Sequence, residues 1–140
     1  MDDSLCLCNT LKAAAACCER ELNDALAEFE ISHCQAMILF KIGEGKISMS
    51  DMSKEMCCHK SNVTQVVAGL EKKGLVTRSL QQNDRRVTDL ALTQKGVAAS
   101  ARLRELLCKR ATDCMGVFTS AEKKTFRELL KKYIEKHRMS

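Results

Sequence analysis

The positions of hydrophobic residues predict a mainly helical chain. Apolar side chains recur at three- and four-residue steps over residues 4–29, over residues 94–115 and again after Thr119, which is the spacing of amphipathic helices. The segment from Ser32 to Ile42 is apolar on nearly every side and is predicted to be a central, buried helix. Four hydroxyl residues stand where an N-cap is expected: Ser32, Ser48, Thr93 and Thr119.

The segment from Lys60 to Gly74 has one apolar side and one polar side without a carboxylate. At about 100° per residue, one side of this helix carries Val63, Val66, Val67 and Leu70. The other carries Ser61, Thr64, Gln65, Ala68 and Lys72, flanked by Lys60 and Asn62. Short hydrogen-bonding side chains without negative charge suit the major groove of DNA. An ordinary amphipathic surface helix shares the pattern, so the neighbouring sequence has to decide between the two.

The preceding residues predict a helix-turn-helix. Ser48 and Asp51 have the spacing of a capping box, and Met52 and Met56 would face inward from a short helix that ends near Cys57. The polar helix described above would follow after a tight turn. Two short helices in this order are typical of DNA-binding proteins.

The residues that follow predict a β-hairpin with arginine at its tip. Residues 75–80 and 86–92 are rich in β-formers, and the polar turn 81–85 joins them. A hairpin in this place is called a wing. It can insert Arg85 or Arg86 into the adjacent minor groove, where a narrow groove concentrates negative potential.

Composition and charge limit the class of protein. The chain has 140 residues, of which 45% are hydrophobic, so we expect one protomer with a buried core. Its net charge of +5 permits a polyanionic partner without requiring one. No apolar run has the length of a membrane span, and the N-terminus lacks the basic stretch of a signal peptide. We therefore expect a cytoplasmic protein without membrane contact.

Four stretches resemble, in order and spacing, a known family of regulators. They are Ser61-Asn62-Val63-Thr64, Leu70-Glu71-Lys72-Lys73-Gly74-Leu75-Val76, Asp84-Arg85-Arg86 and Leu92-Thr93-Gln94-Lys95-Gly96. Residues 48–96 thus resemble the winged-helix region of MarR-type transcriptional regulators. Gln65 stands where many members have arginine, so their base preference does not transfer to this chain.

The resemblance implies a fold, an assembly and a set of contacts. The fold would be mainly α with a small hairpin wing: a single protomer, 1–140, with a winged helix-turn-helix at 46–93 and a dimerisation part at 1–30 and 94–140. The protein would be a homodimer on near-palindromic double-stranded DNA, with half-sites about one helical turn apart. Asp84 would hold the wing arginine, and the DNA contacts would come from Lys60, Ser61, Asn62, Thr64, Gln65, Arg85 and Arg86.

The signal that such a regulator senses is the least defined part of the prediction. We expect a repressor whose DNA affinity is modulated by cysteine oxidation or by a small-molecule ligand. The nine cysteines are an odd number without a Cys-x-x-Cys pair, which favours reduced thiols. Because helix N-termini lower a thiol pKa, Cys34 and Cys58 are candidate sensors, and Cys17 is a third. Three others are expected to be small buried side chains: Cys18, Cys108 and Cys114.

Other functions are compatible with parts of the sequence. A metal-responsive regulator could use Cys and His ligands, although no usual zinc spacing is present and we assign no metal ligand. A winged helix that binds a protein instead of DNA would also fit the uncharged outer face. An enzyme is not expected, because the sequence contains no Ser-His-Asp order, phosphate loop or paired carboxylates, and no cofactor is implied.

Overall fold

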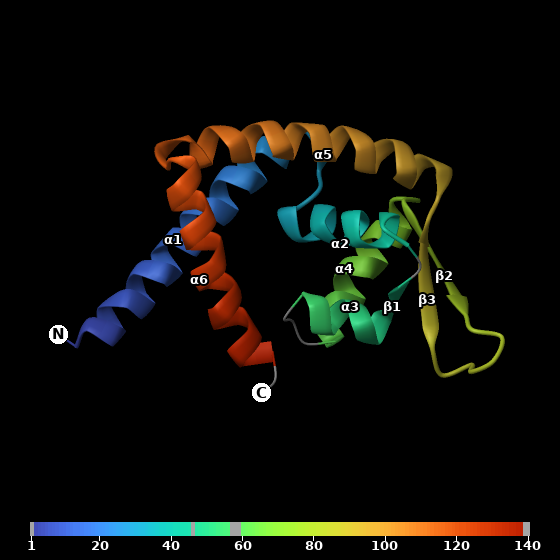
Figure 1. The fold of residues 1–140 in the computed structure, drawn as a ribbon. Helices are drawn as coiled ribbons and strands as arrows, with labels where there is room; N and C mark the ends of the chain where they lie inside the picture. The colour runs from blue at the N-terminus through green and yellow to red at the C-terminus, as the bar shows by residue number, and fades with distance from the viewer. Residues whose placement is uncertain (1, 46, 57–59, 139–140) are drawn as a thin grey trace.

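The computed structural model describes residues 2–45, 47–56 and 60–138 (Figure 1). Over these residues the chain forms six α-helices and a three-stranded antiparallel sheet, which confirms the predicted mainly helical fold with a β wing. None of the described helices has the length and apolar character to cross a membrane. The elements are α1 (Asp3–Leu26), η1 (Ala27–Phe29), α2 (His33–Gly43), β1 (Ile47–Ser48), α3 (Met49–Glu55), α4 (Lys60–Lys72), β2 (Val76–Leu80), β3 (Thr88–Leu92), α5 (Gln94–Cys114), η2 (Met115–Val117) and α6 (Ser120–Arg138).

Helix α2 lies at the centre of the winged-helix part, as its apolar sequence predicted. Ser32 is its N-cap, and Ser32 and Gln35 form a complete capping box, which satisfies free amides of the first turn. Five residues of α2 are buried, and they pack with side chains of α3, α4 and the sheet: Ala36, Ile38, Leu39, Phe40 and Ile42. The helix-turn-helix and the wing are therefore built around one aliphatic core.

The sheet has the strand order β1-β3-β2. The predicted hairpin pairs Val76 with Leu92 and Leu80 with Thr88, and β1 pairs Ile47 with Leu90 on the other edge. Leu90 is fully buried. The central strand is thus held between the hairpin and the residues that lead into α3, which fixes the wing against the helix-turn-helix.

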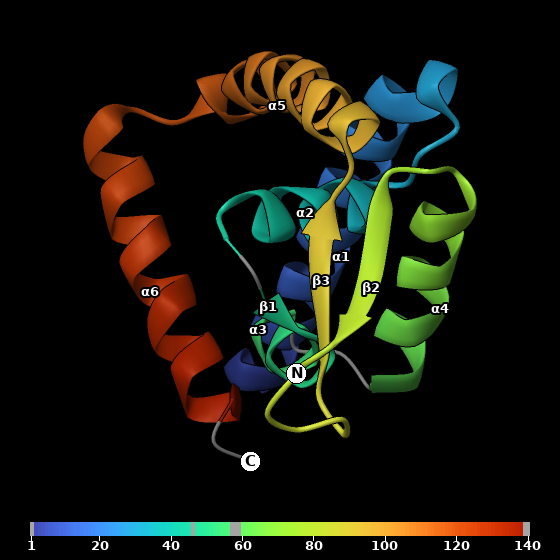
Figure 2. The same cartoon turned by 90° about the vertical axis from the view of Figure 1, so that its right-hand side faces the viewer.

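Two long helices, α1 and α5, pack against each other; α5 runs across the top of the winged-helix part, and α1 descends beside it (Figure 1). Thr93 caps α5 by accepting a hydrogen bond from Gly96 N at 2.9 Å. The predicted capping box before α6 is present, since Thr119 N donates to Glu122 Oε2 at 2.8 Å and Glu122 N donates to Thr119 Oγ1 at 3.2 Å. Figure 2 shows α6 standing apart from the sheet, on the far side of α2 and α3 from α4.

The first helix is shorter than the sequence predicted. The apolar spacing over 4–29 indicated one helix, but α1 ends at Leu26 and a 3₁₀ turn follows. Glu30 then adopts φ 53°, a left-handed conformation uncommon for a residue other than glycine. This turn brings Ile31 into the core at 8% exposure. The spacing of apolar residues continues across the end of α1, so this spacing could not reveal where the helix ends.

A half-buried histidine at the start of α2 predicts a pH dependence of stability. His33 N donates to Asn23 Oδ1 at 2.7 Å. Burial lowers the pKa of its imidazole below the ordinary 6.5, and the nearby Glu19 carboxylate only partly opposes this. As pH falls below 6.5, the unfolded chain takes up the proton first, so folding stability should fall. We expect urea unfolding to give a smaller stability loss from pH 7.5 to 5.5 for His33→Gln than for the wild type; equal losses would contradict the assignment.

Candidate nucleic-acid interface

Helix α4 presents a polar surface because its apolar residues face the core. Val63, Val67 and Leu70 are at most 2% exposed, on the side that the sequence predicted. Ser61, Asn62 and Gln65 are exposed on the opposite side, and Thr64 is half-buried. Gly74, at φ 72°, ends the helix in a left-handed conformation that glycine adopts without strain. Lys60 is the first residue of α4, but its side chain, like Cys58, lies outside the described part of the chain.

The turn of the wing holds one arginine away from the protein. Asp84 Oδ1 accepts hydrogen bonds from Arg86 N at 3.0 Å and from Arg86 Nε at 3.3 Å, and Val87 N donates to the Asp84 carbonyl at 3.0 Å. The Arg86 side chain is nonetheless 93% exposed. Arg85 is also exposed. The carboxylate thus orients a guanidinium whose remaining donors face solvent.

A cleft of about 210 Å³ lies between the start of α3, α4 and the wing. Its lining includes four hydroxyl residues and two arginines but no carboxylate residue. Such a lining can bind phosphate oxygens through hydroxyl and guanidinium donors. The residues are Ser48, Met49, Ser50, Thr64, Arg78, Arg86, Val87 and Thr88.

Arg78 in this cleft was missed by the sequence analysis. It is held by Glu71 of α4, with Nε 2.8 Å from Oε2. The pairing of Leu80 with Thr88 puts Arg78 and Thr88 on the same face of the hairpin, because side chains alternate along a strand. The alternation was visible in the sequence, but the register that joins the two strands was not.

Comparison with known proteins assigns this arrangement to a family. A family model described as "MarR family" matches residues 31–88, a range that contains α2, the helix-turn-helix and most of the wing. The winged-helix part of this chain matches the MarR family. Together with relatives named as transcriptional regulators over 81% of the chain, this match makes the chain a DNA-binding transcriptional regulator and not an enzyme.

Relatives resemble this chain over different lengths. The HTH-type transcriptional regulator PrsX of Escherichia coli is 27% identical over 116 residues, which is 81% of this chain and 70% of PrsX. In three other curated regulators the match spans about half of that protein's own length.

Solved structures share the fold over nearly the whole chain. AbsC, a MarR-family regulator from Streptomyces coelicolor, superposes with a TM-score of 0.90 at 19% identity, covering 100% of this chain and 97% of AbsC. A mutant of Escherichia coli MarR complexed with operator DNA superposes with a TM-score of 0.86 at 24% identity, covering 94% of this chain and 96% of that one.

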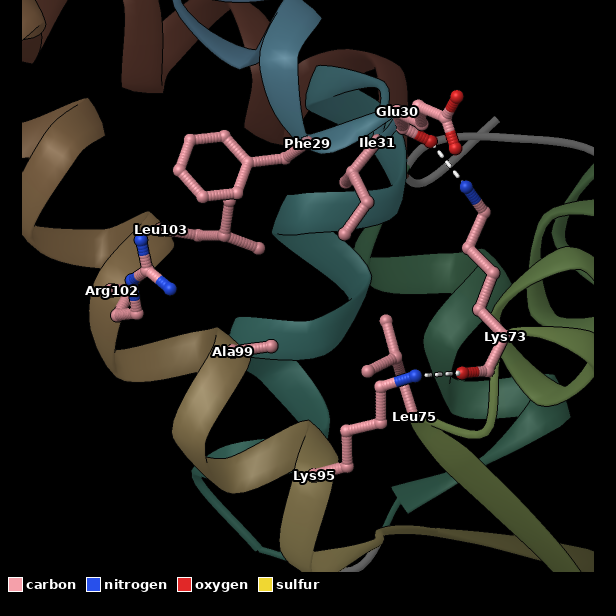
Figure 3. Close-up of a pocket in the computed structure, with 9 residues that line it drawn as sticks. All are labelled: Phe29, Glu30, Ile31, Lys73, Leu75, Lys95, Ala99, Arg102 and Leu103. Carbon is pink, nitrogen blue, oxygen red and sulfur yellow. Dashed lines mark hydrogen bonds between the residues drawn. The ribbon is translucent and has the colours of Figure 1, made fainter.

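A pocket of about 320 Å³ lies where η1, the end of α4 and α5 meet (Figure 3). Its apolar wall consists of Phe29, Ile31, Leu75, Ala99 and Leu103. Three cationic side chains, those of Lys73, Lys95 and Arg102, also line it, together with one acidic residue, Glu30. The pocket therefore joins apolar surface with positive charge.

The three cations of this pocket make few polar contacts with the protein. Lys73 Nζ donates to the Glu30 carbonyl, and Lys95 Nζ donates to the Lys73 carbonyl at 3.1 Å. The Arg102 guanidinium lies 5.5 Å from the centre of the Phe29 ring. Among the described residues, none of the three forms a salt bridge with a carboxylate. Their charge can therefore be balanced by an anionic ligand.

Most of the described cysteines lie on the long helices. Cys17 is exposed and its Sγ is 3.9 Å from Arg20 Nη2, while Cys34 is half-buried in the first turn of α2. The expectation of burial was wrong for Cys108, which is exposed, because it falls off the stripe that α5 turns toward α1. Cys18 and Cys114 are half-buried. Among the described residues, no three Cys, His, Asp or Glu side chains are grouped as a metal site requires.

Proposed function

We propose that this chain is a homodimeric, sequence-specific repressor of transcription that binds near-palindromic double-stranded DNA. The observation that carries the proposal is the cleft between α4 and the wing, which has hydroxyl and guanidinium donors and no carboxylate in its lining. In this proposal α4 enters the major groove. Base and phosphate contacts come from Lys60, Ser61, Asn62, Thr64 and Gln65. Arg86, oriented by Asp84, and Arg85 enter the adjacent minor groove.

A selection from random duplexes at low salt tests this proposal directly. The selected sites should contain two half-sites related by a two-fold axis. Gln65→Ala should relax the base preference at one position of each half-site, at a cost of roughly 1–3 kcal/mol for each specific base interaction removed. Gln94→Ala, an exposed position on α5, is the matched control and should select the wild-type sites. Recovery of no duplex would refute DNA binding through this surface.

Dimerisation is supported by apolar surface on the long helices. A groove of about 770 Å³ runs between α1, α5 and α6, lined among others by Leu11, Cys17, Cys18, Phe118 and Phe126. On α6, Leu129 is 61% exposed and Tyr133 is 48% exposed. A second copy of the chain would remove this surface from water, and burial of apolar area stabilises association.

Disruption of this apolar face should prevent dimerisation. We expect Leu129→Glu to sediment as a monomer at micromolar concentration, because a carboxylate buried in an apolar interface is strongly unfavourable. Leu80→Glu is a matched control, since Leu80 is 60% exposed but lies on the wing; it should sediment as the wild type does. A dimeric Leu129→Glu would exclude α6 from the interface.

The effector is proposed to be a small anion with an apolar body. The support is the pocket of Figure 3, in which Lys73, Lys95 and Arg102 adjoin an apolar wall. Calorimetric titration with a panel of aromatic carboxylates tests it. Lys95→Gln should weaken any ligand that binds there, while Lys109→Gln, also on α5, should not.

Oxidation is the second candidate signal. It is favoured by the position of Cys17, Cys18 and Cys114 in the groove proposed to receive the second copy, where oxidation would change the interface. Mass spectrometry after mild peroxide, combined with a DNA-binding assay, distinguishes the two signals. DNA release without a modified thiol would exclude the oxidative route.

A further inference from the structure

The positive charge of the chain is concentrated on α6. This helix carries seven Lys or Arg residues against three Glu, a surplus of four in a chain whose net charge is +5. Its last eight residues hold Glu135 as their single carboxylate, beside four Lys or Arg residues: Lys131, Lys132, Lys136 and Arg138. Lys131, Lys132 and Arg138 are exposed. Neither the recognition helix nor the wing accounts for this charge.

The basic end of α6, defined here as Lys131, Lys132 and Arg138, lies beside the helix-turn-helix. Arg138 Nη2 donates to the Glu55 carbonyl at 3.0 Å, at the end of α3. Figures 1 and 2 show α6 descending past α2 to the level of α3 and ending at the same end of the molecule as the turn of the wing. The basic end therefore adjoins the end of α3 and lies at the same end of the molecule as the turn of the wing.

The basic side chains lie on a different side of α6 from its apolar residues. At about 100° per residue, Lys131 and Arg138 fall on a different side of the helix from Phe126, Leu129 and Tyr133. A second copy that covers the apolar face thus leaves the basic side chains exposed. Because α1 and α6 lie on the opposite side of α2 from the wing (Figure 1), the basic end lies on the side of the helix-turn-helix that faces the proposed dimer interface.

We propose that the basic end of α6 is an additional contact to DNA, on the backbone phosphates between the two half-sites. The proposal rests on the DNA-binding function and the dimer proposed above. A guanidinium has five N–H donors, so Arg138 can hold the Glu55 carbonyl and still donate to a phosphate. Contacts of this kind carry no sequence information, but they strengthen and position binding.

Two lysine pairs on the same helix provide the test. Lys131→Gln/Lys132→Gln removes two charges at the basic end, and Lys123→Gln/Lys124→Gln removes two at the other end of α6. Binding of a selected operator is measured over a salt series. For the basic-end variant, the log–log slope of affinity against salt should become shallower by about 0.9 for each phosphate that is no longer neutralised, and specific and random duplexes should weaken alike. The Lys123/Lys124 variant should match the wild type.

Two further measurements separate the roles of Arg138 and of the phosphates. Arg138→Lys, which keeps the charge, should retain most of the affinity that Arg138→Gln loses. An operator with uncharged methylphosphonates at its centre should bind the wild type and the basic-end variant equally.

Three results would overturn this inference. Equal slopes for the two lysine-pair variants, with Arg86→Ala still weakening DNA binding, would reject the α6 contact and leave the proposed function intact. A basic-end variant whose dimer dissociates in sedimentation, with an unchanged salt slope, would assign these charges to a contact with the second copy and not to DNA. Failure of the wild type to bind any duplex would reject both proposals.

Discussion

Arg86→Ala is expected to reduce operator affinity by roughly 1–3 kcal/mol for each interaction that it removes, and the proposed dimer has one such interaction in each half-site. The side chain is 93% exposed, so its removal should leave the fold unchanged. Asp84 fixes its direction through the backbone and Nε contacts, so the guanidinium is already oriented before DNA arrives. Fluorescence anisotropy with a selected operator measures the decrease in affinity.

Substitutions at other positions provide controls for this prediction. Lys109→Ala removes an exposed charge from α5 and should bind DNA as the wild type does. Asp84→Ala should weaken binding less than Arg86→Ala, because it frees the arginine without removing it. An Arg86→Ala protein with wild-type affinity would exclude this side chain from the interface and leave Arg85 as the remaining candidate.

Gly96→Ala is expected to lower the free energy of unfolding by about 3 kcal/mol, at the upper end for overpacking. A Cβ at Gly96 would lie 2.0 Å from the Leu75 carbonyl oxygen, where no atom fits. The same oxygen accepts a hydrogen bond from Thr93 N at 3.1 Å, and Thr93 Oγ1 donates to the Gly74 carbonyl. The start of α5 therefore packs against backbone atoms, which cannot move aside as a flexible side chain could.

Gly116 provides the matched control for this substitution. A Cβ there would meet nothing within 4 Å, so Gly116→Ala should change stability little. Urea unfolding of the two variants, followed by circular dichroism, measures the difference. Equal midpoints would show that the contact between α5 and the β2 start is less tight than the distances indicate.

Local sequence signals predicted the helices well. Ser32, Ser48, Thr93 and Thr119 each precede a helix as predicted, because an N-cap depends on residues within one turn of it. The same holds for Gly74, which ends α4 with positive φ. The side of α4 that faces the core also followed from the spacing of Val63, Val67 and Leu70.

Features that depend on residues far apart in the chain could not be predicted from the sequence. The pocket of Figure 3 joins Phe29, Lys73 and Lys95 from three separate elements, and no spacing in the chain relates them. Predicting that Arg78 lies in the cleft would have required the strand register. Predicting the contact of Arg138 with Glu55 would have required the path of α6. The residues of the proposed DNA-binding surface could be predicted to lie close together because they come from consecutive segments.

The length of α5 sets how dimerisation and DNA binding can influence each other. Its 21 residues form a rod of about 32 Å at 1.5 Å per residue, and a tilt of roughly 5° at one end displaces the other by about 3 Å. The wing is attached at one end of this rod and the proposed dimer contacts at the other. A small rotation at the proposed subunit interface would therefore move the wing and the recognition helix by nearly one base-pair step.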